Sequence, residues 1–163
     1  MPREIYPNER RVALTPQNTA LLLKKGFGSV LVEKSAGLEA QFLDEQYRAA
    51  GATLVDKSEL LERSDILLKV RPPALGQEAE SVKEGSTLIS FLYPGQNKPT
   101  VEALAARKAT AFGMEMIPRI SRAQVFDALR FVIELSWLIS RMMLRLGLWG
   151  AVLWPISPDI RQF

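Results

Sequence analysis

The feature that most constrains the fold is a pair of uninterrupted apolar runs in the middle of the chain. Asp65–Val70 and Thr87–Leu92 each have the pattern of a strand buried on both faces, which is typical of a parallel sheet. Pro72-Pro73 ends the first run. Helical segments alternate with such strands along the chain, so the sequence predicts an α/β fold, a parallel sheet with helices on both faces.

The other elements are read from capping and turn residues. Thr15 and Pro16 form a helix start, with Thr15 as the N-cap and Pro16 in the first turn, where its missing N–H costs nothing. This helix ends at Gly26, a residue type that often closes helices. Further helices are predicted over residues 42–50, 58–63, 99–108 and 122–129, and further strands over residues 29–33, 53–55 and 110–113.

Composition excludes several classes of function. The 163 residues are 47% hydrophobic and 24% charged, which indicates a globular domain and not a disordered chain. The absence of Cys and His excludes thiol nucleophiles, disulfides, zinc fingers and histidine-based triads or metal sites. A net charge of +3 gives no argument for a nucleic-acid partner. The polar start of the chain does not have the pattern of a signal peptide.

The composition changes abruptly after Leu129. Residues 1–129 carry 17 basic and 16 acidic side chains, whereas residues 130–163 carry four Arg, two acids, no Lys and all three Trp. We therefore expect one domain over 1–129 and a divergent, apolar helical tail over 130–163. Three charged residues of the tail, Glu134, Arg141 and Arg145, oppose membrane insertion. An amphipathic helix that packs on the domain, lies on a membrane surface or aggregates is expected instead.

Ligands of open parallel sheets bind beyond the carboxyl ends of the strands. The candidates there are the residues that follow the predicted strands, namely Lys69, Arg71, 93–97 and 115–119. No Gly-x-Gly-x-x-Gly motif accompanies them, because the only Gly-x-Gly, Gly26-Phe27-Gly28, precedes a strand and has Leu31 at its third position. A Walker-type loop is also missing. The 163 residues therefore contain no recognisable cradle for the phosphates of a nucleotide.

Four runs of residues resemble the superfamily of alanine dehydrogenases and transhydrogenase α-subunits. They are Pro2–Pro16, with Pro-Arg-Glu and Asn-Glu-Arg-Arg, then Ile66–Pro73, Ser90–Asn97 and Pro118–Leu129. The last two are similar to the transhydrogenase branch, since alanine dehydrogenases carry a substrate-binding His where this chain has Tyr93. The resemblance covers about residues 2–129 and implies a Rossmann- or flavodoxin-like N-terminal domain.

The resemblance also implies an activity. Transhydrogenases transfer hydride between NAD(H) and NADP(H), coupled to proton movement through a membrane-spanning component. NAD(H) binds between this domain and a following Rossmann domain, and NADP(H) binds on a partner component. The intact family is dimeric, so a homodimer is implied, as is a place at the cytoplasmic or matrix face of an energy-transducing membrane. The protein contributes positioning and electrostatics.

For three residues of the last run, the resemblance implies a role at the nicotinamide ring of the coenzyme. The resemblance implies that Arg119 donates hydrogen bonds to its carboxamide, that Asp127 accepts from the same group or orients Arg119, and that Gln124 lies between the two nicotinamide rings as the residue closest to the reaction. Spacing alone favours a plainer interpretation, in which Arg119 and Asp127 form a surface ion pair.

Arg11 and Lys69 occupy positions where alanine dehydrogenases bind the carboxylate of pyruvate. A guanidinium fork and a point charge together suit a small anion. The alternative is a solvated Arg in a loop and a Lys at a strand end that pairs with a neighbouring acid. We favour this alternative because Tyr93 replaces the His of the substrate site.

Both ends of the chain depart from the family. The family begins with a strand ahead of the motif at Pro2-Arg3-Glu4, and Met1 leaves no room for it. We therefore expect the domain to lack its first strand and to expose an unpaired edge. After Leu129 the family continues with a Ser- and Ala-rich helix and a Rossmann domain, which residues 130–163 do not resemble. A shifted reading frame or an alternative last exon would explain this difference.

Two classes of function follow. The first is the nicotinamide-side part of a transhydrogenase α-subunit, inactive alone because the phosphate cradle is missing. The second is a non-catalytic isoform or fragment that acts by association with the intact enzyme. A third interpretation is a keto-acid-binding domain like that of alanine dehydrogenase, with its site at Arg11 and Lys69.

Overall fold

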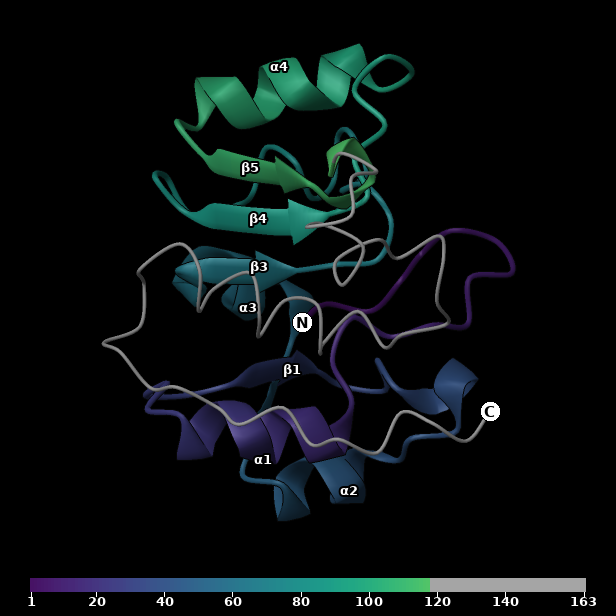
Figure 1. Ribbon diagram of the computed structural model, residues 1–163, viewed down its shortest axis with the longest axis vertical. Coiled ribbons are helices and arrows are strands. Elements are labelled where there is room, and N and C mark those ends of the chain that lie inside the picture. The colour runs from purple at the N-terminus through teal and green to yellow at the C-terminus, as the bar shows by residue number, and fades with distance from the viewer. Residues whose placement is uncertain (118–163) are drawn as a thin grey trace, which may run out of the picture.

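The computed structural model describes residues 1–117 of the chain. The described residues form five strands and four α-helices, with two short 3-10 helices at Leu38–Ala40 and Met114–Met116 (Figure 1). Helices and strands alternate except between Ile66–Leu68 and Thr87–Ser90, two strands with no helix between them. All strand pairs are parallel. The predicted α/β fold with parallel strands is therefore confirmed for the part of the chain that is described.

The strands form two sheets instead of a continuous one. β1 (Leu31–Glu33) pairs with β2 (Thr53–Val55), while β4 (Thr87–Ser90) lies between β3 (Ile66–Leu68) and β5 (Thr110–Gly113). The N-terminus lies between β1 and β3 (Figure 1). The split matters because it places the first residues of the chain between the two sheets.

The helices form where the capping residues predict them. α1 (Pro16–Lys24) begins after Thr15, whose hydroxyl accepts a hydrogen bond from the N–H of Asn18. The chain then turns at Gly26, which has a φ of +97°, a conformation that suits glycine. The other helices are α2 (Asp44–Ala49), α3 (Lys57–Arg63) and α4 (Lys98–Ala106).

One predicted helix is shorter than the sequence indicated. The helix predicted over 42–50 begins only at Asp44, because Leu43 is extended and serves as its N-cap. The side chain of Gln46 accepts a hydrogen bond from the N–H of Leu43 at 2.9 Å. This local contact fixes the start of the helix at Asp44, two residues later than the apolar pattern alone predicts.

Helices cover the strands from both sides, as the two hydrophobic clusters show. Successive strand residues belong to different clusters, because side chains alternate between the faces of a sheet. One cluster joins the strands to α1 and α2, through Leu22, Tyr47, Leu68 and Ile89. The other joins the strands to α3 and α4, through Leu60, Leu67, Leu88 and Leu104.

Several expectations concern residues beyond 117 and so lie outside the described part of the chain. These are the helix over 122–129, the boundary after Leu129 and the apolar tail over 130–163. Within residues 1–117, no helix is long and apolar enough to cross a membrane.

Candidate functional site at the carboxyl ends of the strands

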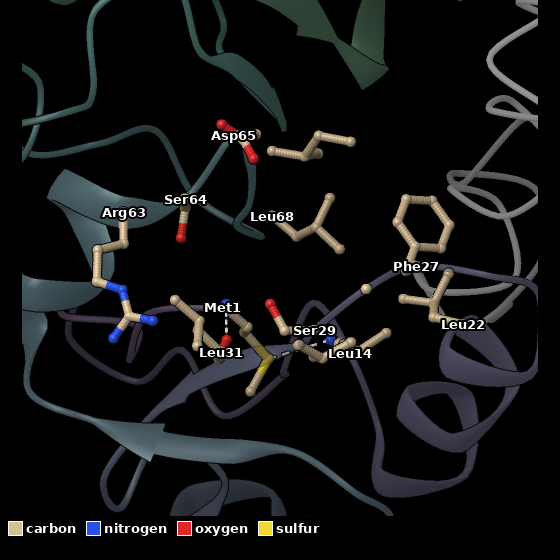
Figure 2. A pocket seen from close by; sticks show the side chains of 13 residues that line it. Met1, Leu14, Leu22, Phe27, Ser29, Leu31, Arg63, Ser64, Asp65 and Leu68 are labelled. Atoms are coloured by element: carbon tan, nitrogen blue, oxygen red, sulfur yellow. Dashed lines mark hydrogen bonds between the residues drawn. The ribbon is translucent and has the colours of Figure 1, made fainter.

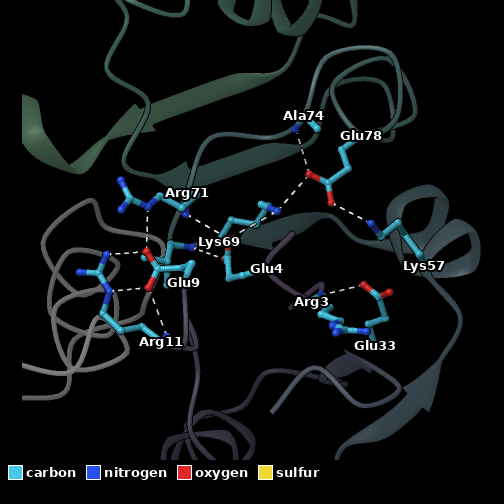
Figure 3. Close-up of polar contacts among 11 residues, drawn as sticks. Arg3, Glu4, Glu9, Arg11, Glu33, Lys57, Lys69, Arg71, Ala74 and Glu78 are labelled. Carbon is cyan, nitrogen blue, oxygen red and sulfur yellow. Dashed lines mark hydrogen bonds and ion pairs between the residues drawn. The ribbon is translucent and has the colours of Figure 1, made fainter. Parts of the chain in front are cut away.

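A buried lysine lies at the carboxyl end of β3. The Lys69 side chain is 0% exposed, and its Nζ is 3.0 Å from Glu78 Oε2 and 3.6 Å from Glu4 Oε2 (Figure 3). Its backbone N–H donates to the carbonyl of Ile89, which continues the β3–β4 ladder by one residue. The strand therefore fixes the backbone of Lys69 while two carboxylates hold its charge.

Glu78 is the most buried of these acids. Its side chain is 0% exposed; one oxygen accepts from the N–H of Ala74 at 3.0 Å, and the other lies 3.2 Å from Lys57 Nζ. Burial opposes ionisation of Glu78, but Lys69, the Ala74 N–H and Lys57 outweigh it, so the pKa of this carboxyl is lowered. Glu78 is thus the negative centre of a buried ionic cluster.

Glu4 connects the N-terminal segment to the residues after β3. Its two carboxylate oxygens accept from the N–H groups of Val70 and Arg71 at 2.6 and 3.2 Å. Burial raises the pKa of Glu4 above its ordinary value, against the effects of Lys69 and of these two backbone donors. Glu4 therefore satisfies backbone groups that would otherwise have no partner at this edge.

A second ionic group surrounds Glu9, whose side chain is 4% exposed. Arg11 donates to it from Nε and from its terminal nitrogen, both at 2.7 Å, and Arg71 Nε donates at 2.7 Å. The hydrogen bonds from Arg11 lower the pKa of Glu9 to about 2, and this carboxylate raises the pKa of Arg11. One carboxylate thus holds two guanidinium groups from distant parts of the chain.

Arg11 and Lys69, the two cations considered above for a substrate carboxylate, are each paired within the protein. Lys69 contacts Glu78 and Glu4, and Arg11 contacts Glu9. The two cations have different carboxylate partners and do not converge on a shared empty position. A small anion would have to displace these carboxylates, and breaking the buried pair of Lys69 and Glu78 in this way is costly.

The loops after β4 and β5 are joined by Glu115. This carboxylate accepts from the N–H groups of Leu92 and Tyr93 at 2.9 and 2.6 Å. Tyr93 has a φ of +47°, which is unusual for a residue with a large side chain, and its ring stacks on that of Phe91 with centroids 6.2 Å apart. Glu115 thereby holds the strained turn after β4 against the segment that leads out of β5.

The described structure covers only some of the predicted site. Lys69, Arg71, Tyr93 and Glu115 all lie at the carboxyl ends of strands. Arg119, Gln124 and Asp127, the residues predicted to contact a nicotinamide, lie outside the described residues. Within residues 1–117 there is no group of three or more acids that could hold a metal ion.

Sequence reasoning assigned no role to the three acids that organise this edge. Glu4 and Glu9 lie in the N-terminal run that carries the family resemblance, and Glu78 lies in the connection between β3 and β4. The signal that could have found them is Lys69 itself, a cation inside a run predicted to be buried on both faces, which needs acidic partners. Only the fold brings residues 4, 69 and 78 together.

Comparison with known proteins gives one family. The sequence model described as "Alanine dehydrogenase/PNT, N-terminal domain" matches residues 1–135. This stretch includes the whole of 2–129, for which the resemblance was expected, and continues a little past Leu129.

The relatives found are much longer than this chain. "NAD(P) transhydrogenase subunit alpha" of Cereibacter sphaeroides is 47% identical over 129 residues, which are 78% of this chain and 24% of that protein. A relative from Rickettsia prowazekii, whose name describes one piece of a divided NAD(P) transhydrogenase subunit alpha, is 40% identical over 83% of this chain and 38% of its own length. The chain thus spans well under half the length of these relatives.

A solved structure has the same fold. The crystal structure of a transhydrogenase from Sinorhizobium meliloti superposes with a TM-score of 0.72 at 37% identity, over 78% of this chain and 36% of that one. The described strands and helices therefore correspond to one portion of a larger molecule of this kind.

Proposed function

Because the chain belongs to the alanine dehydrogenase/PNT N-terminal domain family, we propose that it supplies the nicotinamide-facing part of an NAD(H) site in a proton-translocating NAD(P) transhydrogenase. Bound NAD(H) would supply the hydride-carrying ring. A following Rossmann domain would hold the diphosphate of NAD(H), and another component would hold NADP(H). The Rickettsia prowazekii relative, by its name one piece of a divided subunit alpha, agrees with an α-subunit that works together with further components.

The ionic pairing at the carboxyl edge is the observation that carries this proposal. Lys69, Arg11 and Arg71 are each held by a buried carboxylate, and the sequence has no glycine motif for phosphate binding. We therefore infer that the residues assigned to the coenzyme contact its uncharged carboxamide end and not its diphosphate. This division of labour requires a second domain to complete the site.

We assign three residues to the nicotinamide end. Arg119 would donate hydrogen bonds to the carboxamide oxygen, Asp127 would accept from the carboxamide NH₂ or orient Arg119, and Gln124 would lie between the two nicotinamide rings. Arg119 follows Glu115 by four residues, so the hydrogen bonds of Glu115 to the β4 turn limit where this segment can begin. Correct placement of the two rings is the protein's main contribution to such a reaction.

The proposal extends to partners and location. The chain would act together with the NADP(H)-binding and membrane-spanning components, as part of a dimeric assembly at the cytoplasmic or matrix face of the membrane. A non-catalytic chain that merely associates with the intact enzyme remains the alternative. The two are distinguished by whether residues 119–127 affect hydride transfer.

Calorimetric titration of the 163-residue chain with NADH tests whether these residues lack a binding site for the coenzyme's phosphates. We expect a Kd weaker than about 100 μM, equivalent to less than about 5.5 kcal/mol of binding free energy. Tighter binding would contradict the proposed division of the site. Pyruvate in a parallel titration tests the alternative keto-acid site at Arg11 and Lys69, for which we expect no heat of binding, since both cations already have carboxylate partners.

A chimera tests the residues themselves. Residues 1–129 would replace the matching N-terminal segment of the Cereibacter sphaeroides subunit alpha, and hydride transfer would be measured with that organism's other transhydrogenase components. We expect activity, and a loss of about tenfold to a hundredfold for R119Q, because a charge-assisted hydrogen bond is removed. The matched control is R122Q, which changes a neighbouring Arg without a proposed contact. Equal activity of the two variants would refute the assigned role of Arg119.

A further inference from the structure

The turn that follows β4 is held from two sides. The Leu92 carbonyl accepts from Asn97 Nδ2 at 2.9 Å. The Tyr93 carbonyl accepts from the N–H groups of Gln96 and Asn97 at 2.9 and 3.0 Å. On the other side, the N–H groups of Leu92 and Tyr93 donate to the carboxylate of Glu115 at 2.9 and 2.6 Å. The residues after β5 therefore act on this turn through Glu115.

Both oxygens of the Glu115 carboxylate are used. Oε2 accepts from Leu92 and Oε1 accepts from Tyr93, so one side chain binds two consecutive N–H groups. An amide side chain of the same size would offer only one oxygen, because its NH₂ group is a donor and would face the other N–H. The arrangement therefore requires a carboxylate at position 115, and glutamine there would release one of the two N–H groups.

The position of this carboxylate is defined by its neighbours. A Cβ added to Gly113 would lie 3.0 Å from Glu115 Oε1 and 3.3 Å from Met116 Cγ, closer than ordinary contact between such atoms. Gly113 thus leaves the space that the carboxylate occupies. Met114 is 3% exposed and belongs to the cluster that joins the strands to α1 and α2. Glu115 is therefore anchored by a buried neighbour.

The residue that Glu115 holds has an uncommon backbone conformation. Tyr93 has a φ of +47°, and such conformations of large residues persist only where the surroundings impose them, often at functional sites. Its half-buried ring stacks on Phe91. The pKa of Arg11 is raised mainly by Glu9 and to a smaller extent by Tyr93, so the phenol lies near this guanidinium. The turn therefore directs the ring along the carboxyl edge of the sheet.

This edge is where a parallel sheet binds its ligands. Tyr93 follows β4, the middle strand of the three-stranded sheet, with the ends of β3 and β5 on either side. Ligands of such sheets lie beyond the carboxyl ends of the strands. The nearby cations Lys69 and Arg11 already have carboxylate partners. The planar, largely apolar Tyr93 ring is instead suited to contact with a flat heterocycle.

We propose that Glu115 is a positioning residue for hydride transfer: it holds Tyr93 in the strained turn, so that the Tyr93 ring forms one wall of the nicotinamide end of the coenzyme site. The inference rests on the proposed function and adds two residues to it. Glu115 touches neither the coenzyme nor the reacting atoms and acts only through Tyr93. A wall on one side restricts the orientations of a flat ring, which is how it would speed the reaction.

The chimera with the Cereibacter sphaeroides subunit alpha measures this role in a complete subunit. We expect E115Q to lower kcat about fivefold to twentyfold and to change KM for NADH less than about twofold. The reason is that ring placement is lost while the contacts of a following domain with the diphosphate are kept. The matched control is E102Q, the same change on α4 at a side chain that is 66% exposed, which should leave both constants unchanged.

A second variant separates positioning from stability. Y93G removes the ring at a position whose positive φ suits glycine. We expect it to lower kcat about as much as E115Q does, although urea unfolding of the full chain should show no loss of stability beyond that of K108G. Lys108 also has a positive φ, +53°, and K108G should leave kcat unchanged. If Glu115 only stabilised the turn, Y93G would keep full activity.

The double variant tests whether Glu115 acts through Tyr93. E115Q should cost less than about a further twofold in kcat once Y93G is present, because the ring it positions is gone. Losses that multiply would overturn the proposal, as would values of kcat for E115Q or Y93G equal to those of the controls. An active chimera with such values contradicts this inference alone. A chimera without hydride transfer contradicts the proposed function and this inference with it.

Discussion

The two ends of the gap between β1 and β3 differ in whether their polar groups have partners among the described residues. At the carboxyl end, Glu4 and Glu78 hold Lys69 and accept from neighbouring N–H groups. At the amino end, the backbone groups of Ile66 and Leu68 face an apolar cavity without partners among the described residues. The comparison teaches that ionic groups stabilise the carboxyl end, whereas the cavity at the amino end is lined mainly by apolar side chains and strand backbone (Figure 2).

The largest expected effect tests the cohesion of the charged end. In K69M the buried carboxylates of Glu78 and Glu4 lose their shared counter-charge, and removal of one partner of a buried ion pair costs about 3–5 kcal/mol. Urea unfolding of the variant and of the parent chain measures this difference. The matched control is K83M, which removes a pair with Asp65 in which both side chains are largely exposed. Equal losses of unfolding free energy in the two variants would mean that the buried cluster stabilises the fold no more than an exposed ion pair does.

The next prediction concerns the amino end and the pH. Burial lowers the pKa of the Met1 amine from 8.0 to about 5. The unfolded chain therefore binds a proton between pH 5 and 8 that the folded chain does not, and the stability should rise with pH across this window, by at most about 4 kcal/mol. N-acetylation of Met1 keeps the N–H that donates to Leu31 but removes the charge. Urea unfolding of the acetylated chain should lack this rise, and an identical pH profile for both chains would contradict the burial of the amine.

The smallest effect is expected where the charged end reaches solvent. The Arg11 side chain is 62% exposed, and Arg71 also holds Glu9. R11Q should therefore cost less than about 1 kcal/mol at neutral pH. The Glu9 carboxylate contributes stability above its ordinary pKa that is lost as the pH falls toward 2, and this loss should begin at a higher pH in R11Q. Acid titration followed by circular dichroism measures the midpoint; an unchanged midpoint would show that Arg71 alone holds Glu9.

Local patterns in the sequence were sufficient for most elements of the described fold. Thr15-Pro16 predicted the start of α1, and the apolar runs at 65–70 and 87–92 predicted β3 and β4. The element boundaries moved by a few residues where a side chain competes with the pattern, as Gln46 does at the start of α2. The assigned roles of Arg119, Gln124 and Asp127 stay predictions, since these residues lie outside the described range.

The sequence by itself determined the parallel α/β arrangement and the family, because apolar periodicity, caps and motifs are properties of neighbouring residues. The tertiary structure alone decided that Lys69 is buried against Glu4 and Glu78, and that β1 and β3 belong to separate sheets with a cavity between them. Both features depend on the relative placement of residues that are far apart in the chain. Contacts of this kind depend on where the whole fold places each group, and no local pattern encodes them.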